Sequence, residues 1–541
     1  MGCYFRSFSN HKRRIIMRKR FKTIRFFCFL ILTLGMICSP LYAGEKVLKI
    51  SMDAVDAGQS SFNPFTTSTT NNVYYVVYDR LVEMGADGII YPHLLSSWDV
   101  SEDGLTITFT LKEGVKFHDG SDLNADVLKW FLENLGKGQS KYMVAAVESI
   151  DIKDNLTVIL NLSRPDPNIL YNFTSSFTGI PSKQAVEKYK DEYGRKYVVG
   201  TGPFEFVSWK TGDEIVLKKN PEYQWGCPLS DNQGPAKIDK LIFKEILEDS
   251  TRFLEFKTGG IDILEKAPTL FLAKLKKDPK AKIITMASNT NFHMVMNTKR
   301  EFLSDVNIRK AIALAVNQEN ILKAVFQGSG APAYTYLIDR LPARNVDKKY
   351  EIHFDLKTAQ EILAKEGWTA GDDGILAKEG KKLSLALWCK SDSDERKIAE
   401  IIQDQLSKLG VEIRIEQFDP SSIKAEFKKG NHDLVVRSYG WDNADILEWF
   451  FNSTRPGYPT VSMWHDNESD YLMQKAMTRS KTSEERIENF KEYHEYLLSQ
   501  YLWAPLINTA NNHAISKRVT MSSPPRFKIL IGPPILDMTV K

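Results

Sequence analysis

Residues 98–135 have the sequence WDVSEDGLTITFTLKEGVKFHDGSDLNADVLKWFLENL, and this stretch decides the fold. Apolar and polar residues alternate strictly from position 105 to position 111, which predicts a β-strand with one buried face. The turn at residues 101–104 before it would pair this strand with a strand around Trp98. The stretch therefore begins with a predicted antiparallel hairpin.

A second part of the same stretch predicts a short strand and a helix. We expect a strand at residues 115–117 and a turn at Asp119-Gly120. Asn124 is placed to cap the helix that follows. The apolar face of that helix would consist of Leu128, Phe131, Leu132 and Leu135.

The order of these residues also resembles a known family. The pattern SWxxSEDGLTxTFxLKEGVKFHDG…LNADVxxW closely resembles the extracellular solute-binding proteins of family 5, the peptide-, dipeptide- and nickel-binding receptors of ABC importers. Three further stretches resemble the same family, with the sequences VYDxLVEM…DGxIxPxLxxSW, GTGPFxFxxW…xVLxxNPxYxWG and VNIRKAIALAVNQENIL. The resemblance covers nearly all of residues 47–515. It implies an α/β, type II periplasmic-binding-protein-like fold with two lobes, a hinge and an extra α+β subdomain in lobe one.

The N-terminus predicts export to the periplasm. A basic region, an apolar run at residues 26–38 and Ala43 before Gly44 are typical of a secretory signal peptide at residues 1–43. This segment holds nine basic residues and no acidic ones, so its removal leaves 63 basic against 68 acidic side chains. The excess of basic charge thus belongs to the leader, and no nucleic-acid partner is predicted.

The second half of the chain predicts a parallel sheet. Strands at residues 383–388, 411–417 and 433–437 alternate with helices at 395–409 and 421–429. From the whole pattern we expect lobe one at residues 44–285 with its subdomain at about 83–185, lobe two at 286–503, and a return to lobe one at 504–541. A helix is also predicted at residues 73–81.

The loop at residues 438–445 is the strongest candidate for binding, because it combines two aromatic residues and two carboxylates. Its candidate residues are Tyr439, Trp441, Asp442, Asn443 and Asp445. A carboxylate beside aromatic rings suits an ammonium group. The loop also resembles the family's Trp-x-x-Asp loop, in which the Asp holds the amino end of a peptide. The family's Asp-Pro pair is Asp445-Ile446 here, so either Asp442 or Asp445 could be its counterpart.

Five other residues are candidates for the lining of the cleft, although an ordinary structural role fits each of them equally well. They are Phe62, Thr67, Asn291, Phe292 and Trp464.

Catalytic motifs are absent from the sequence, which lacks G-x-S-x-G, H-E-x-x-H and C-x-x-C. We therefore expect no enzyme, no cofactor and no metal site, and the rival interpretation of a secreted hydrolase is disfavoured. Cys227 and Cys389, which follow the leader, could form a disulfide or stay buried thiols, and we expect thiols. The predicted protein is a monomer that captures an oligopeptide or dipeptide for ABC permease subunits in the inner membrane. The alternative cargo is nickel or a metal chelate.

Overall fold

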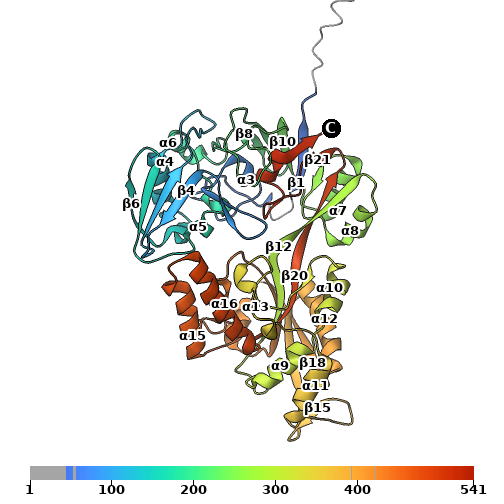
Figure 1. Cartoon of the computed structure of the whole chain (residues 1–541). Helices are drawn as coiled ribbons and strands as arrows, with labels where there is room; N and C mark the ends of the chain where they lie inside the picture. The colour runs from blue at the N-terminus through green and yellow to red at the C-terminus, as the bar shows by residue number, and fades with distance from the viewer. Residues whose placement is uncertain (1–43, 53–56, 392, 421) are drawn as a thin grey trace, which may run out of the picture. The chain divides into compact units, whose positions relative to one another are not determined.

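Two long antiparallel strands, β12 (Ala281–Met296) and β20 (Trp503–Ser516), connect the two lobes of the protein (Figure 1). The computed structural model describes residues 44–541 apart from 53–56, 392 and 421. Residues 46–541 form one compact unit. The predicted signal peptide at residues 1–43 lies outside the described residues.

Lobe two is built on parallel strands, as the sequence predicts. Strand β17 (Ser384–Lys390) pairs in parallel with both β18 (Glu412–Phe418) and β19 (Leu434–Gly440). The helices α12 (Asp394–Ser407) and α13 (Ile423–Lys429) provide the crossovers. Strand β19 extends three residues beyond the predicted end at Arg437, because its antiparallel pairing with β12 continues to Gly440.

Lobe one continues the same sheet, whose order is β18-β17-β19-β12-β20-β11-β1-β10-β9-β8. Its strands are β1 (Val47–Met52), β8 (Phe204–Lys210), β9 (Glu214–Lys219), β10 (Lys240–Glu245) and β11 (Ile263–Leu264). Two parallel neighbours of β1 belong to one β-α-β unit. It consists of β10, helix α7 (Asp249–Thr258) and β11, and Gly259 ends the helix with a left-handed φ of 82°.

The stretch at residues 98–135 forms the predicted hairpin and helix. Strand β4 (Leu95–Val100) pairs with β5 (Thr106–Leu111), and β7 (Thr157–Leu162) and β6 (Val147–Ile152) complete a four-stranded sheet. The apolar residues of β5 are buried in alternation. Asn124 caps α4 (Ala125–Leu135), because its Oδ1 accepts a hydrogen bond from the Val127 amide at 3.0 Å.

Two local predictions are wrong. The predicted helix at residues 73–81 is only α3 (Tyr74–Val77), because the backbone is extended at Tyr78 and the side chains that follow enter a buried polar network described below. The predicted strand at residues 115–117 is an isolated bridge between Lys116 and Asp122.

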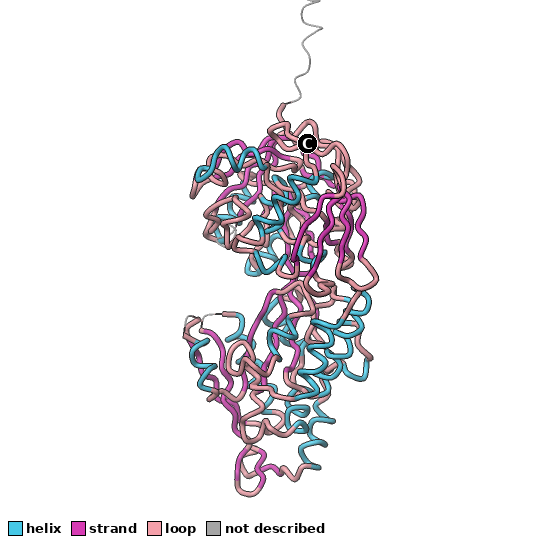
Figure 2. The backbone as a smooth tube through the Cα atoms, turned by 90° about the vertical axis from the view of Figure 1, so that its left-hand side faces the viewer, coloured by secondary structure: helices cyan, strands magenta, loops and turns pink. Residues whose placement is uncertain are grey.

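Apolar side chains gather in two main clusters, one in each lobe. Ile50, Phe109 and Phe131 belong to the cluster of lobe one, whereas Met294 and Val435 belong to that of lobe two. The strand pair β12–β20 contributes to both clusters and so runs from one lobe into the other (Figure 2). The exact lobe boundaries at residues 285 and 503 stay predictions.

The remaining elements complete the two lobes. The helices are α5 (Ile169–Asn172), α6 (Lys183–Tyr189), α8 (Thr269–Lys276), α9 (Val306–Leu314), α10 (Gln318–Phe326), α11 (Leu356–Lys365), α14 (Ile446–Phe451), α15 (Asn467–Gln474) and α16 (Ser483–Ser499). The short strands are β2 (Val82–Met84), β3 (Ile90–Pro92), β13 (Ala331–Pro332), β14 (Thr369–Ala370), β15 (Leu376–Lys378), β16 (Lys381–Lys382), β21 (Val519–Met521) and β22 (Met538–Val540). None of the helices in the described part of the chain is long and apolar enough to span a bilayer.

Candidate ligand-binding site

The loop between β19 and α14, residues 441–445, lies where the two lobes meet. Asn443 on this loop belongs to lobe two, and its Nδ2 donates a hydrogen bond to Oδ1 of Asn168 in the subdomain of lobe one at 3.0 Å. The amide of Trp441 donates to the Asn289 carbonyl on β12 at 3.0 Å, which holds the start of the loop against the connecting strand. Parallel strands expose such loops at their carboxyl ends, where α/β sheets bind ligands.

Asp442 is paired with two cations. Arg340 donates to Asp442 Oδ1, and Lys528 Nζ lies 3.4 Å from Asp442 Oδ2. Lys528 belongs to the C-terminal segment, whose neighbours Leu530 and Ile531 pack in the core of lobe one. Burial alone would raise the pKa of Asp442, but Lys528 and Arg340 outweigh it and hold the pKa below its ordinary value. This carboxylate is therefore already neutralised by the protein.

Asp445 has the opposite surroundings. Its Oδ1 accepts a hydrogen bond from Trp441 Nε1 at 2.7 Å. Among the described residues, no basic side chain forms an ion pair with it. Burial raises the pKa of the Asp445 carboxyl, and the hydrogen bond from Trp441 and the more distant Arg486 offset this only in part. A carboxylate in this position gains from an external cation.

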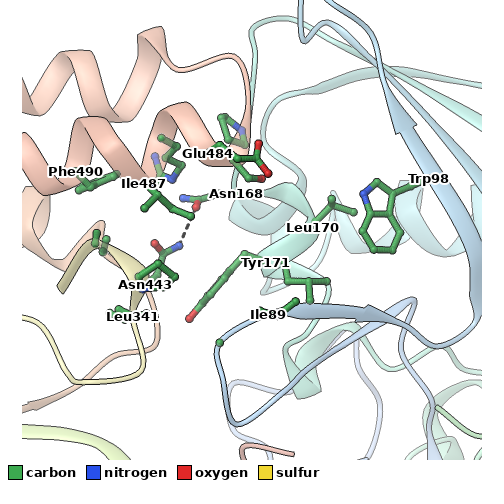
Figure 3. Close-up of a pocket in the computed structure, with 18 residues that line it drawn as sticks. Ile89, Trp98, Asn168, Leu170, Tyr171, Leu341, Asn443, Glu484, Ile487 and Phe490 are labelled. Carbon is green, nitrogen blue, oxygen red and sulfur yellow. Dashed lines mark hydrogen bonds between the residues drawn. The ribbon is translucent and has the colours of Figure 1, made fainter. Parts of the chain in front are cut away.

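A cavity of about 370 Å³ lies beside this loop, between the subdomain of lobe one and lobe two (Figure 3). Trp98, Leu170 and Tyr171 line it from the subdomain. Asn443 and Ala444 of the loop, together with residues of α16, line it from lobe two. The volume falls within the range of small-molecule sites.

The other predicted residues of the loop and of β12 are held by protein contacts. Tyr439 accepts a hydrogen bond from Arg437 Nη2 at 2.5 Å and packs edge-on against Phe450. Burial raises the pKa of Tyr439 to about 12. Asn291 Nδ2 donates to the Tyr336 carbonyl at 2.7 Å. Tyr439, Trp441 and Asn291 nevertheless share the wall of one small hollow at the end of β19.

Four other predicted residues are buried or partly buried and pack against the cores of the lobes. Phe62 is fully buried and packs on Trp209, and Thr67 donates to the Thr69 carbonyl at 2.6 Å. Phe292 packs on Phe326 in the core of lobe two. Trp464 also packs against that core. Phe292 is the strand partner of Ser438 at the start of the predicted loop, but none of the four residues lines the cavity or the small hollow, and whether any of them contacts cargo stays a prediction.

Sequence reasoning missed several residues that the structure brings to the loop. They are Asn168, Tyr171, Arg340, Arg486 and Lys528. Each lies far from residues 441–445 in the chain, so no local spacing could have connected them. The nearest signal was the Pro-x-Pro at residues 165–167, which marks a turn at the subdomain edge just before Asn168.

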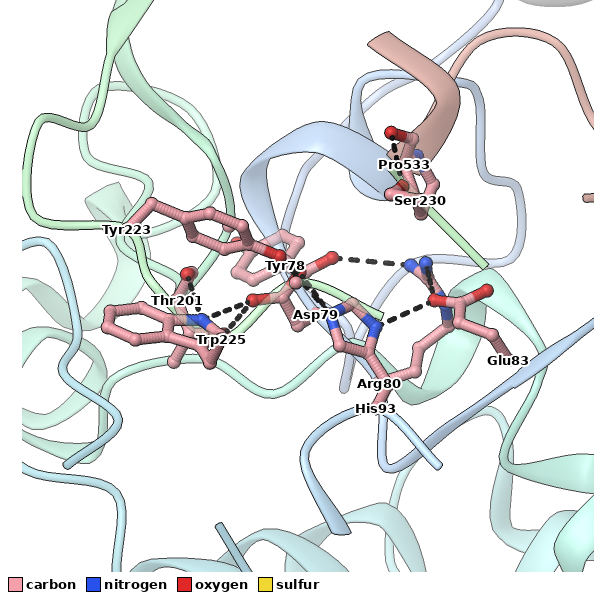
Figure 4. Close-up of polar contacts among 12 residues, drawn as sticks. Tyr78, Asp79, Arg80, Glu83, His93, Thr201, Tyr223, Trp225, Ser230 and Pro533 are labelled. Carbon is pink, nitrogen blue, oxygen red and sulfur yellow. Dashed lines mark hydrogen bonds and ion pairs between the residues drawn. The ribbon is translucent and has the colours of Figure 1, made fainter. Parts of the chain in front are cut away.

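A second cluster of buried charge lies within lobe one (Figure 4). His93 lies between two acids, with Nδ1 3.0 Å from Glu83 Oε1 and Nε2 3.3 Å from Asp79 Oδ1. Arg80 pairs with Glu83 as well, and Trp225 Nε1 donates to Asp79 Oδ2 at 2.9 Å. Arg80 and His93 outweigh the effect of burial and lower the pKa of Glu83. Glu83 has Arg80 as a charged partner and Asp79 accepts hydrogen bonds from Thr201 and Trp225, so both acids have partners within the protein, which is the pattern of a structural network.

The described residues contain neither a cluster of metal ligands nor a disulfide. In that part of the chain, no group of three or more His, Cys, Asp or Glu could hold a metal ion. Cys227 and Cys389 are both buried free thiols, and burial raises the pKa of both.

Comparisons with known proteins identify the family. The sequence model of the "Bacterial extracellular solute-binding proteins, family 5 Middle" matches residues 90–458. The chain is 26% identical to "Heme-binding protein A" of Haemophilus influenzae over 82% of this chain and 83% of that protein. It is 27% identical to "Oligopeptide-binding protein AppA" of Bacillus subtilis over 80% of each.

A solved structure supports the fold. NikZ from Campylobacter jejuni, in complex with Ni(L-His), superimposes with a TM-score of 0.68 at 23% identity, covering 92% of this chain and all of that one. The prediction of a type II periplasmic-binding-protein fold with two lobes is confirmed. The chain belongs to the bacterial extracellular solute-binding proteins of family 5.

Proposed function

We propose that this protein is the substrate-binding component of an ABC importer and that it captures an oligopeptide or dipeptide through the peptide's amino group. The observation that carries the proposal is Asp445, a partly buried carboxylate beside an interlobe cavity, whose hydrogen bond comes from the neutral Trp441. A peptide ammonium would supply the missing cation, and the indole of Trp441 would add a cation–π contact. The relative named as an oligopeptide-binding protein supports a peptide as cargo.

Asp442 is the poorer candidate for this role. Its two oxygens already have Arg340 and Lys528 as partners, so a cargo ammonium would have to displace a cation that is covalently part of the protein. The ion pair with Lys528 instead links lobe two to lobe one. The hydrogen bond between Asn443 and Asn168 links them a second time. These two contacts give the loop a role in closure of the lobes over cargo.

Closure would follow from the cargo's contacts with both lobes. A ligand shifts an open–closed equilibrium only by its difference in affinity for the two states. Cargo at Asp445 is bound by lobe two, and its body in the adjacent cavity would contact the subdomain of lobe one. The closed protein would then bind the permease from the periplasm, with its peptide chemically unchanged.

The test is to identify what the protein carries. The full chain is expressed with its leader, purified from the periplasm, and examined by native mass spectrometry followed by sequencing of the released ligand. We expect peptides with free amino termini on the wild-type protein, and their loss from Asp445→Asn. A nickel chelate in their place would contradict the proposal and support the alternative cargo, since a chelated metal brings its own ligands. Hydrolysis of the peptides during incubation would contradict the proposal that the protein carries peptides without reacting with them.

A further inference from the structure

The cavity between the subdomain and lobe two has mainly apolar walls. Trp98 and Leu170 come from the subdomain, and Leu341, Ile487 and Phe490 come from lobe two (Figure 3). A polar main chain or a hydrated cargo group would gain little from such walls, whereas a large apolar side chain would bury much of its surface against them.

Two residues that line this cavity each carry a buried hydrogen-bond donor without a partner among the described residues. Tyr171 Oη and Arg486 Nη2 are both buried, and neither has a hydrogen-bond partner among the described residues. Arg486 is only 6% exposed; its other terminal nitrogen donates to the Ala476 carbonyl at 3.0 Å. Buried polar groups without partners are costly, so two in one cavity indicate a ligand that completes them.

The charges around Arg486 limit what that ligand can be. Asp445 and Asp166 attract Arg486 from beyond ion-pair distance, and Arg164 repels it. These charges compensate one another in part, so the missing group is an acceptor oxygen and does not need a full negative charge. A main-chain carbonyl or a terminal carboxylate of a peptide meets this requirement.

The cavity also adjoins the proposed ammonium site. Asn443 and Ala444 line its wall, and Asp445 is the next residue in the chain. A peptide whose amino group lies at Asp445 would therefore have a side chain within reach of the cavity.

We propose that this cavity is the specificity pocket for one large apolar residue of the cargo peptide, and that Tyr171 and Arg486 donate hydrogen bonds to a main-chain oxygen of that peptide. This inference rests on the proposed function, since it assumes a peptide as cargo. It deepens that function by naming the class of side chain that the protein selects.

The probes are four tripeptides measured by isothermal titration calorimetry on the full mature protein. They are Ala-Ala-Ala, Phe-Ala-Ala, Ala-Phe-Ala and Ala-Ala-Phe. Burial of a phenyl ring predicts that Phe at one of the three positions lowers Kd about 10- to 100-fold relative to Ala-Ala-Ala. Binding of all four with similar Kd overturns the pocket and leaves the proposed function standing. If none of the four nor longer peptides bind, both are overturned.

Tyr171→Phe is the sharpest variant, because it removes only a hydroxyl that has no partner among the described residues. We expect Kd for the best tripeptide to rise about 3- to 10-fold while the thermal midpoint of the free protein stays the same or rises. Tyr142→Phe is the matched control, since Tyr142 is 63% exposed on the same subdomain. An unchanged Kd in Tyr171→Phe would overturn the hydrogen bond to cargo.

Ile487 allows the volume of the pocket to be changed in both directions. Ile487→Trp should fill the cavity and reduce the preference for Phe to less than about threefold, whereas Ile487→Ala should enlarge the cavity and shift the preference from Phe towards Trp. If the Trp variant does not fold, the Ala variant still tests the pocket, because its larger cavity should favour Trp over Phe at the selected position. Equal preferences in wild type and Ile487→Ala would contradict the assignment.

Discussion

The acids of the two clusters of buried charge differ in how completely they have polar partners within the protein. In lobe one, Glu83 is paired with Arg80 and with His93, and Asp79 is paired with His93. In the loop after β19, Asp442 is paired in the same way, but Asp445 has a neutral donor and no ion pair among the described residues. The acids of the first cluster have all their partners within the protein, whereas Asp445 in the second cluster can still pair with an external cation.

The difference separates a structural role from a binding role. Removing one partner from a closed cluster leaves a buried charge without compensation, so the cost appears as lost stability. Removing a carboxylate that lacks a cationic partner costs little stability in the free protein, so the loss appears in the affinity for the ligand. Four experiments test this contrast.

Arg80→Met should have the largest effect, because it leaves the Glu83 carboxylate with one partner in a fully buried site. We expect the free energy of unfolding to fall by about 3–5 kcal/mol, measured from the shift of the urea transition of the protein. Arg526→Met is the control, because it breaks the exposed ion pair with Asp231 and should cost less than about 1 kcal/mol. Equal losses in the two variants would show that the buried network is not what stabilises lobe one.

Asp445→Asn should weaken peptide binding by about 2–3 kcal/mol, roughly 30- to 150-fold in Kd, without loss of stability. Asparagine can still accept the hydrogen bond from Trp441 but cannot pair with an ammonium group. Asp442→Asn should show the reverse pattern. It leaves Arg340 and Lys528 without their counter-ion, so stability falls while Kd rises less than about tenfold. The two Kd values come from calorimetry, and exchanged patterns would assign cargo to Asp442.

The pH dependence distinguishes the same two acids. Because the pKa of Asp445 is raised in the folded protein, the folded state holds this proton more tightly than the unfolded state does. The unliganded protein should therefore gain stability from Asp445 as pH falls through the interval between its raised and its ordinary pKa. Peptide affinity should fall over the same interval, since the protonated acid cannot pair with an ammonium group.

Other charges facing Asp445 set the size of this effect. Arg486 lowers its pKa, and Glu448 and Asp166 raise it. The pKa of Asp442 is lowered, so its ion pairs persist at these pH values. Calorimetry from pH 7 downward should give parallel losses of affinity in wild type and Asp442→Asn, and none in Asp445→Asn. A loss of equal size in Asp445→Asn would place the titrating group elsewhere.

Lys528→Met should have the smallest effect. It removes one interlobe ion pair of moderate length, so we expect Kd for peptide to rise less than about fivefold, and this difference to shrink in high salt. Small-angle scattering would show whether the closed form becomes less populated. Lys517→Met, at an exposed lysine of the same C-terminal segment, should change neither quantity. If Lys528→Met weakened binding as much as Asp445→Asn does, closure of the lobes would contribute more to affinity than recognition of the ammonium group.

The fold was largely predictable because its strongest signals are local. The alternation in β5 and the cap at Asn124 depend on residues that lie only a few positions apart in the sequence. The prediction of a helix at residues 73–81 was wrong because contacts that are distant in the sequence determine the structure there. Asp79 and Arg80 enter a network with residues far along the chain, and tertiary contacts there override local helical preference.

The candidate site was predictable only in part. The loop at residues 438–445 was identified by its composition, but the sequence left Asp442 and Asp445 as equal alternatives. The distinction depends on Arg340 and Lys528, which lie 102 and 86 residues from Asp442. Tyr171 and Arg486 could not be predicted as site residues, because a hydrogen-bond donor without a partner is a property of the packed structure and has no sequence pattern.

The most direct test of the central claim is a double-mutant cycle between Asp445 and the amino group of cargo. Kd is measured by calorimetry for one tight-binding peptide and its N-acetylated form, on wild type and on Asp445→Asn. We predict that acetylation weakens binding to wild type about 30-fold or more and changes binding to Asp445→Asn by less than about threefold. An acetylation effect of the same size in both proteins would contradict the account, because the cargo's ammonium would then be recognised somewhere other than Asp445.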